Sequence, residues 1–331
     1  MEEPETIQNE YVPSLTDILQ ISNYAKKLLD SLPSDIKKIS IFGDVIYSFF
    51  RMHPELDINN DDVSYETIYE YEEEIDDIYD LSGSNIEIQS KLEKNVKMKR
   101  YCNDFCNFWE SFWNDNYHQM IPGFIYINLS RFTHLEKFYL VNIYTYKIEK
   151  IPNRVHNLLC RSCEIRLLDE LPEELIILNC NGNCLYRIPP LNHTKLKSLF
   201  CCSNYLTLLP RLPKTTEWVY CYNNSIGKLP TLPPLLEYLS CSSNEIRILP
   251  KLPESIKGVY IDSNYLRELP ETLPKSLQNL FCNNNRIRRL PELPPFLKRF
   301  ACQNNPIVEY SLFPPSLVYL NTDGNAMMLE S

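Results

Sequence analysis

The sequence predicts an α/β repeat solenoid whose short strands form one parallel sheet, and three observations predict it. An asparagine returns every 20 or 21 residues over the second half of the chain. Apolar residues precede it at fixed offsets, as in Leu236-x-x-Leu239-x-Cys241-x-x-Asn244. A Leu-Pro pair follows, as at Leu249-Pro250. The recurring residues are Asn183, Asn204, Asn224, Asn244, Asn264, Asn285, Asn305 and Asn325.

A period of about 20 residues with the pattern L-x-x-L-x-L/C-x-x-N-x-L is the signature of leucine-rich repeats. Alternation within residues 236–255 predicts a strand with Leu239 and Cys241 facing the core and Tyr238 and Ser240 facing outward. Parallel strands need a crossover, and here the crossover is too short for a helix. Its prolines hold φ near the polyproline value. We therefore expect leucine-rich repeats with a parallel concave β-sheet and a polyproline-like convex side.

Each recurring Asn lies where a predicted strand ends and the chain turns inward. Its buried amide can bond to the backbone of neighbouring turns, whose polar groups would otherwise stay unpaired. We therefore expect these Asn side chains to form a structural ladder. One turn cannot bury its own inner face, so stability should come from the stacking of turns.

The repeat pattern divides the chain into three parts. Residues 153–331 hold about nine units, the first with Cys163 at the Asn position. Residues 126–152 are expected to form one or more irregular first repeats. Residues 1–120 hold 25 acidic against 10 basic residues, whereas the whole chain has a net charge of −10. We expect residues 1–125 to be an acidic, mainly helical N-terminal region.

Two interpretations of this N-terminal region stay open. Residues 14–31 and the aromatic-rich residues 97–120 have helical spacing, which favours a cap over the first repeat. The segment Leu32–Asp44 fits the repeat pattern with Asp in place of Asn, yet its L-P-x-D-I start also resembles the opening of an F-box. The later Cys-x-x-Phe…Phe-Trp stretch resembles the continuation of F-boxes. This resemblance implies a Skp-type adaptor of a cullin ubiquitin ligase as partner, with the repeats choosing the substrate.

Seven of the twelve cysteines occupy the repeat position that Leu usually holds. Free Cys behaves as a small buried hydrophobe, so we expect an interior ladder of reduced thiols and a reducing compartment. The acidic N-terminus lacks a secretory signal, and no apolar run approaches the roughly 18 residues that span a bilayer. We expect a cytoplasmic location, in the chain's own cell or inside a host cell, and no membrane partner. The seven are Cys160, Cys180, Cys201, Cys221, Cys241, Cys282 and Cys302.

No motif predicts catalysis, a cofactor or a metal site. The five histidines are scattered, and no glycine-rich phosphate motif occurs. Cys160-x-x-Cys163 lacks the second pair that a zinc site needs, and both residues fall on core positions. The basic residues Arg286, Arg288 and Arg289 belong to an acidic chain, so no nucleic acid is expected as partner. We expect a protein that is not an enzyme.

Large aromatic side chains occupy outward positions of the predicted strands. On a concave sheet such side chains form hot spots for another protein. The alternative is that they stack on one another without a partner. After Asn325 only six residues follow, so self-association through an uncapped C-terminal edge is a further prediction. The predicted partner-binding residues are Phe200, Trp218, Tyr220, Tyr222, Tyr238, Tyr260 and Phe281.

The segments Leu229–Asn244 and Leu290–Asn305, with their L-P-x-L-P phrase, resemble the short repeats of bacterial effector proteins of the YopM- and IpaH-like type. The resemblance covers roughly residues 150–328. It implies a twisted solenoid with a helical N-terminal cap that binds host proteins. Some members carry a ubiquitin-ligase domain with a catalytic Cys after the repeats. Since this sequence ends at Ser331, we expect it to lack that domain.

Overall fold

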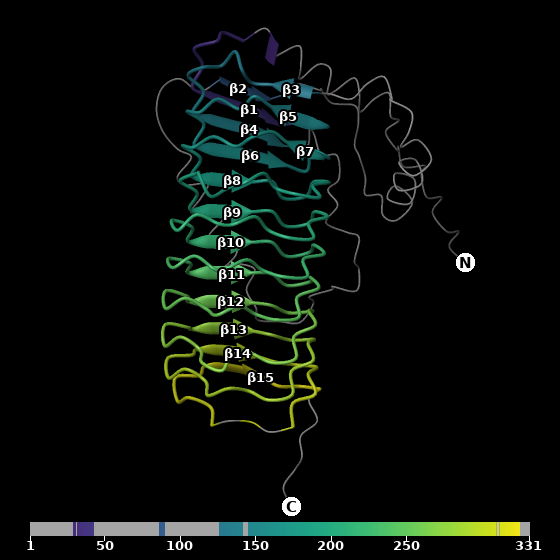
Figure 1. Ribbon diagram of the computed structural model, residues 1–331, viewed down its shortest axis with the longest axis vertical. Coiled ribbons are helices and arrows are strands. Elements are labelled where there is room, and N and C mark those ends of the chain that lie inside the picture. The colour runs from purple at the N-terminus through teal and green to yellow at the C-terminus, as the bar shows by residue number, and fades with distance from the viewer. Residues whose placement is uncertain are drawn as a thin grey trace, which may run out of the picture.

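The computed structural model describes residues 29–30, 32–42, 86–89, 126–141, 145–308, 310 and 312–324. In these residues the chain winds into a solenoid of stacked turns, and each turn adds one short strand to a long parallel sheet (Figure 1). Three of the first turns add a strand to a second parallel sheet on the other side of the solenoid. The predicted parallel-strand solenoid is confirmed.

The larger sheet has twelve strands in the order β15-β14-β13-β12-β11-β10-β9-β8-β6-β4-β1-β2. They are β1 (Lys38–Phe42), β2 (Ile86–Gln89), β4 (Lys137–Val141), β6 (Asn157–Arg161), β8 (Ile177–Asn179), β9 (Ser198–Phe200), β10 (Trp218–Tyr220), β11 (Tyr238–Ser240), β12 (Gly258–Tyr260), β13 (Asn279–Phe281), β14 (Arg299–Ala301) and β15 (Tyr319–Asn321). The second sheet, which the sequence did not predict, consists of β3 (Tyr126–Asn128), β5 (Lys147–Glu149) and β7 (Leu167–Leu168).

Neighbouring strands pair with equivalent repeat positions opposite each other. Trp218 pairs with Tyr238 and Val219 with Leu239, and the pairings from β8 to β15 keep this register. Equivalent side chains therefore form columns that rise about 4.8 Å per turn. Residues one repeat apart in the sequence therefore lie beside each other on neighbouring turns.

A proline closes the tight turn before most strands. The N–H of Leu236 donates to the carbonyl of Pro233 (3.2 Å), and that of Ile256 donates to Pro253 (3.2 Å). Proline suits this place because it supplies the acceptor and has no N–H that needs a partner. In the described residues after β7, the outer side has no helix and only the isolated bridge between Leu208 and Lys228. No helix in the described part is long and apolar enough to cross a bilayer.

Seven of the recurring Asn side chains lie between turns and satisfy backbone groups there. Asn244 donates through Nδ2 to the carbonyls of Cys221 (3.0 Å), Cys241 (3.1 Å) and Ser242 (3.1 Å). Its Oδ1 accepts the N–H of Ile226 at 2.9 Å. Each Asn thus ties its turn to the preceding one where the strand ends. The others are Asn183, Asn204, Asn224, Asn264, Asn285 and Asn305, whereas Asn325 lies outside the described residues.

The residue before each of these Asn residues has a left-handed backbone, which the sequence analysis missed. Ser243 and Ser263 both have φ 52°, Asn284 has φ 52° and Gly182 has φ 62°. Glycine and, less readily, asparagine adopt this conformation at low cost, whereas other L-residues are strained by it. The sequence does indicate this conformation, because Gly, Asn or Ser recurs at the position just before each ladder Asn.

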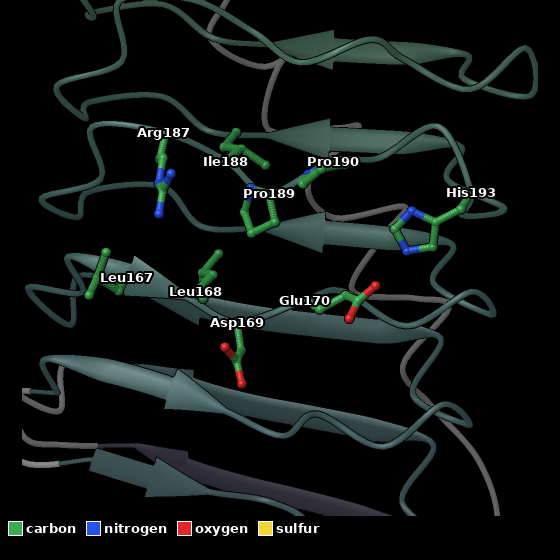
Figure 2. A pocket seen from close by; sticks show the side chains of 9 residues that line it. All are labelled: Leu167, Leu168, Asp169, Glu170, Arg187, Ile188, Pro189, Pro190 and His193. Atoms are coloured by element: carbon green, nitrogen blue, oxygen red, sulfur yellow. The ribbon is translucent and has the colours of Figure 1, made fainter.

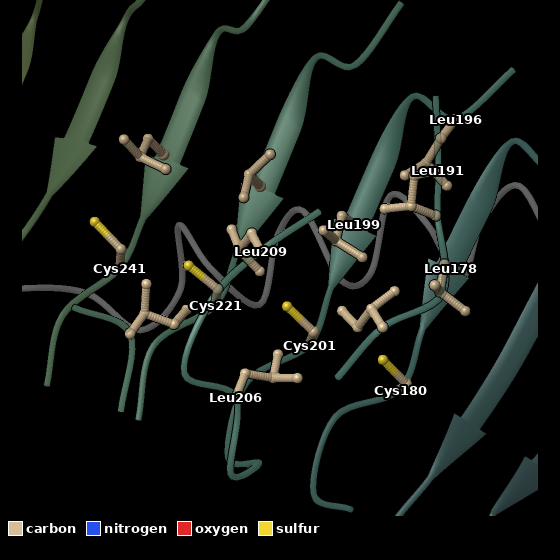
Figure 3. Packing of buried hydrophobic residues seen from close by; sticks show 14 of the residues in the cluster. Leu178, Cys180, Leu191, Leu196, Leu199, Cys201, Leu206, Leu209, Cys221 and Cys241 are labelled. Atoms are coloured by element: carbon tan, nitrogen blue, oxygen red, sulfur yellow. The ribbon is translucent and has the colours of Figure 1, made fainter. Parts of the chain in front are cut away.

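Cysteines line the core as a column beside the ends of the strands. Figure 3 shows Cys180, Cys201, Cys221 and Cys241 on successive turns, packed among leucines of the strands and of the outer side. Burial raises the pKa of the Cys180 and Cys221 thiols to about 12, so both are protonated at neutral pH. On the turn after Cys241, the same position is occupied by Ile261, which is equally buried. The column is therefore a set of packing residues, in which a thiol and an aliphatic group are interchangeable.

The sequence of residues 32–42 fits either a repeat or the opening of an F-box, and in the structure these residues form a turn of the solenoid. β1 pairs in parallel with β4, from Lys38 opposite Lys137 to Phe42 opposite Val141, and β2 pairs with the other edge of β1. Leu32 and Ile36 of the L-P-x-D-I motif are buried in the solenoid core. The predicted helix over residues 97–120 and most of the predicted helix over residues 14–31 lie outside the described residues.

Candidate interaction surface

One face of the twelve-stranded sheet packs on the core, and the other, the predicted concave face, is called the open face below. In each strand from β8 to β15 the middle residue points into the core, as Val219 and Leu239 do. The first and third strand residues point to the open face, and so does the second residue after the strand. The third-position column reads Asn179, Phe200, Tyr220, Ser240, Tyr260, Phe281, Ala301 and Asn321.

Phe200 and Tyr220 lie on the open face, yet they are only 6% and 7% exposed. Their rings stack with centroids 5.2 Å apart and an interplanar angle of 24°, and Ile177, Trp218 and Tyr222 pack against them. The prediction that Phe200 and Tyr220 are exposed is wrong, because the common register brings equivalent rings into stacking contact. Trp218 and Tyr222 are half-buried and keep exposed surface.

A second stack runs through Tyr260, Phe281 and Tyr319. The rings of Tyr260 and Phe281 lie 5.2 Å apart, and those of Phe281 and Tyr319 lie 6.1 Å apart. Phe281 reaches a ring two turns away because the intervening residue of its column is the small Ala301. The predicted exposure of Phe281 is also wrong, since it is 4% exposed, whereas Tyr260 is half-buried.

Ser240 and Gly258 separate the two stacks. A Cβ on Gly258 would lie 2.8 Å from Cδ1 of Tyr238 and 3.1 Å from Cε2 of Tyr260. The missing side chain therefore lets both tyrosine rings cover this position, and Tyr238 is half-buried like Tyr260. Four predicted anchors thus retain exposed surface in one strip, called the aromatic strip below: Trp218, Tyr222, Tyr238 and Tyr260.

A polar column borders the aromatic strip, and the sequence analysis did not single it out. The N–H of Asp262 donates to Ser242 Oγ (3.1 Å), that of Asn283 to Asp262 Oδ1 (2.7 Å), and that of Gln303 to Asn283 Oδ1 (2.7 Å). Burial raises the pKa of Asp262 to about 6, and this effect outweighs the hydrogen bonds from Asn283, which lower the pKa. The open face thus carries a poorly solvated carboxylate beside its aromatic rings.

A cavity of about 460 Å³ lies on the outer side, where the second sheet ends at β7 (Figure 2). His193 Nε2 lies 2.8 Å from the carbonyl oxygen of Leu171, and Asp169 accepts the N–H of Lys150 at 3.1 Å. The lining contains no serine, threonine or cysteine that could act as a nucleophile. It consists of Leu167, Leu168, Asp169, Glu170, Arg187, Ile188, Pro189, Pro190 and His193.

Cys160 and Cys163, the pair with metal-like spacing, are both fully buried in the core. The Sγ of Cys163 lies 2.9 Å from the carbonyl oxygen of Arg161 and 3.3 Å from that of Leu140. In the residues that the structure describes, no group of three or more His, Cys, Asp or Glu side chains could hold a metal ion. The two cysteines therefore act as core residues.

The last described turn covers its core least. Leu320 is 43% exposed, whereas Leu280 and Phe300 at the equivalent position of earlier turns are fully buried. Val318 beside it is 80% exposed. Self-association through this edge stays a prediction.

Solved structures with a similar fold are leucine-rich-repeat proteins. YopM from Yersinia pestis, described as a leucine-rich effector protein, matches with a TM-score of 0.55 and 28% identity over 58% of this chain and 56% of its own. YopM from Yersinia enterocolitica WA-314 matches with a TM-score of 0.51 and 30% identity over 63% of this chain and 53% of its own. The leucine-rich-repeat domain of APL1B has a TM-score of 0.50 at 17% identity, over 70% of this chain and 75% of that domain.

The match therefore spans about half of each YopM chain. No protein-family model matches the chain, and no curated protein matches it. The neighbours establish the leucine-rich-repeat fold and include proteins of the effector type, which agrees with the resemblance of the repeat segments.

Proposed function

We propose that this chain is a non-enzymatic interaction module that binds a partner protein on the open face of its leucine-rich-repeat solenoid. The observation that carries the proposal is the aromatic strip. The rings of Trp218, Tyr222 and Tyr260 rest on buried aromatic neighbours, so little side-chain entropy is lost when a partner orders them. Large aromatic side chains held in this way are the usual anchors of protein interfaces.

The size of the open face indicates how a partner binds. From β8 to β15 it is about 34 Å long and about 12 Å wide, which gives on the order of 400 Å² of projected area. A standard interface buries about 800 Å² on each partner. A tightly bound partner therefore also contacts a flank of the solenoid.

Paired substitutions test this proposal. Trp218→Ala with Tyr260→Ala removes two half-buried rings of the strip, and Tyr186→Ala with Ile248→Ala removes two exposed apolar side chains away from the open face. Affinity capture from cell extracts with quantitative mass spectrometry should show a protein that the first variant loses and the second retains. Equal capture by the strip variant and the wild type, with both folded by circular dichroism, would refute binding on the open face.

The ubiquitin-ligase receptor remains the alternative for the N-terminal region. Its support is reduced, because Leu32 and Ile36 of the F-box-like motif pack in the solenoid core. The expected result is that a Skp-type adaptor does not co-purify with the full chain under native conditions. Stoichiometric co-purification would establish the alternative instead.

We also propose that the protein works in a reducing compartment, such as the cytoplasm of its own cell or of a host cell. The cysteines support this, because all ten in the described residues are buried thiols without a disulfide, and reduced thiols are typical of proteins kept in a reducing environment. Mass spectrometry after alkylation of protein isolated from its native source should find these cysteines reduced. Disulfides among them would contradict the proposal.

Self-association is proposed for the C-terminal edge, where Leu320 and Val318 are exposed. The expected outcome is a mass that rises with concentration in light scattering and falls back to the monomer in Leu320→Lys. A monomer mass at all concentrations would rule it out.

A further inference from the structure

Four arginines and one tyrosine line a flank of the solenoid just after the Asn ladder. They occupy five of the six first and third positions after the ladder Asn on three successive turns, the sixth position is Glu245, and all six residues are exposed. The residues between them, Ile246, Leu266 and Ile287, are fully buried and anchor the backbone of this flank. The set, called the arginine edge below, comprises Arg247, Tyr265, Arg267, Arg286 and Arg288.

Tyr265 holds two of these arginines in position. Its ring centroid lies 4.7 Å from the guanidinium carbon of Arg286 and 5.9 Å from that of Arg247. Both side chains come from neighbouring turns, so the ring is flanked by cations on two sides. A guanidinium stacked on an aromatic face keeps its N–H donors free to point outward, and less entropy is lost when they bind.

The four arginines of this edge outnumber its one acidic residue, Glu245, in contrast with another flank of the same turns. Before the strands, Lys197 pairs with Glu217 (3.1 Å) and Lys257 with Glu237 (2.8 Å), so each of these lysines has a glutamate on an adjacent turn. None of the four arginines of the arginine edge forms an ion pair within the part of the chain that is described. Like charges on turns about 4.8 Å apart repel each other, which costs stability unless an anion binds.

We propose that the arginine edge binds an extended acidic segment of a protein partner. Guanidinium groups in a row can each donate two hydrogen bonds to a carboxylate, and carboxylates on one side of an extended chain recur every second residue, about 6.6 Å apart. A single-stranded nucleic acid fits less well, because such sites offer successive aromatic rings for bases and this edge has one.

The proposal is independent of the aromatic strip, and a binding assay on the full chain tests it. The probes are a fluorescent peptide of alternating Glu and Ser, the same peptide with Gln for Glu, and a single-stranded DNA of equal charge. The variant is Arg267→Gln with Arg288→Gln. Its matched control is Arg211→Gln with Lys214→Gln, which removes two exposed cations elsewhere.

The wild type should bind the Glu peptide in a saturable and salt-sensitive manner, and the Gln peptide at least about tenfold more weakly. The edge variant should lose about tenfold in affinity for the Glu peptide, the control less than about twofold, and Trp218→Ala none. Absence of saturable peptide binding would overturn the proposal. Equal losses in edge variant and control, or tighter binding of the DNA than of the peptide, would overturn it as well.

Discussion

Replacement of Asp262 by Asn should stabilise the protein at neutral pH. The carboxylate is half-buried in the polar column of the open face, where Oδ1 accepts the N–H of Asn283 at 2.7 Å. An amide can keep this bond, since Asn283 itself occupies the same position one turn later and accepts the N–H of Gln303 at 2.7 Å. The substitution therefore removes the charge and retains the hydrogen-bonding pattern.

The magnitude follows from the pKa of Asp262. Burial raises it from 3.8 to about 6, so between these values the folded protein holds a proton that the unfolded chain has lost. The wild type consequently loses stability as the pH rises through this window, at about 1.4 kcal/mol for each pKa unit. With allowance for the partial exposure of the carboxylate, Asp262→Asn should gain about 1–3 kcal/mol at pH 7.5 relative to its effect near pH 4.

Urea unfolding of both proteins at pH 4, 5, 6 and 7.5 measures this difference. Asp323→Asn is the matched control, because Asp323 lies in the same column but is exposed, and its substitution should change stability little at any pH. A stability difference for Asp262→Asn that is independent of pH, or a loss of stability at pH 7.5, would show that the buried charge does not carry this cost.

Three further outcomes are expected. Asn244→Ala should lower the free energy of unfolding by about 3–5 kcal/mol in urea titrations, because it removes four hydrogen bonds and leaves the buried N–H of Ile226 without a partner. A loss below about 1 kcal/mol would contradict the role of the ladder. Ser263→Asn should raise the free energy by about 0.5–1 kcal/mol, since φ is 52° there, and an unchanged thermal midpoint would argue against strain. In a chain with Cys102 and Cys106 replaced by Ser, a thiol reagent at pH 8 should label the core cysteines only at the rate of unfolding, and rapid labelling of the native protein would contradict their burial.

The repeat fold could be predicted from the sequence because every turn repeats the same local pattern. The spacing of Asn183 to Asn305 and the alternation around residues such as Leu239 identify the strands directly. β1 and β2 were harder to assign, since about 45 residues separate two adjacent strands of the sheet. Pairing over such a distance leaves no period in the sequence. The second sheet was likewise missed, because only three turns contribute a strand to it and its positions do not recur along the later turns.

The open face could be predicted only in part. The sequence places Phe200, Tyr220 and Phe281 on the outer side of the strands, and the structure agrees about the side. Their burial, however, depends on which residues occupy the same column one and two turns away. Gly258 and Ala301 determine how neighbouring rings lie, and Asp262 becomes half-buried through neighbours on other turns.

The sequence by itself determined the solenoid, its register and the ladder of Asn and Cys residues, because these follow from a local pattern repeated at constant length. The tertiary structure decided which aromatic rings keep exposed surface, which carboxylate is poorly solvated, and which arginines form no ion pair with another described residue. These properties depend on contacts between turns 20 to 40 residues apart, where the identity of each neighbour varies although its position is constant.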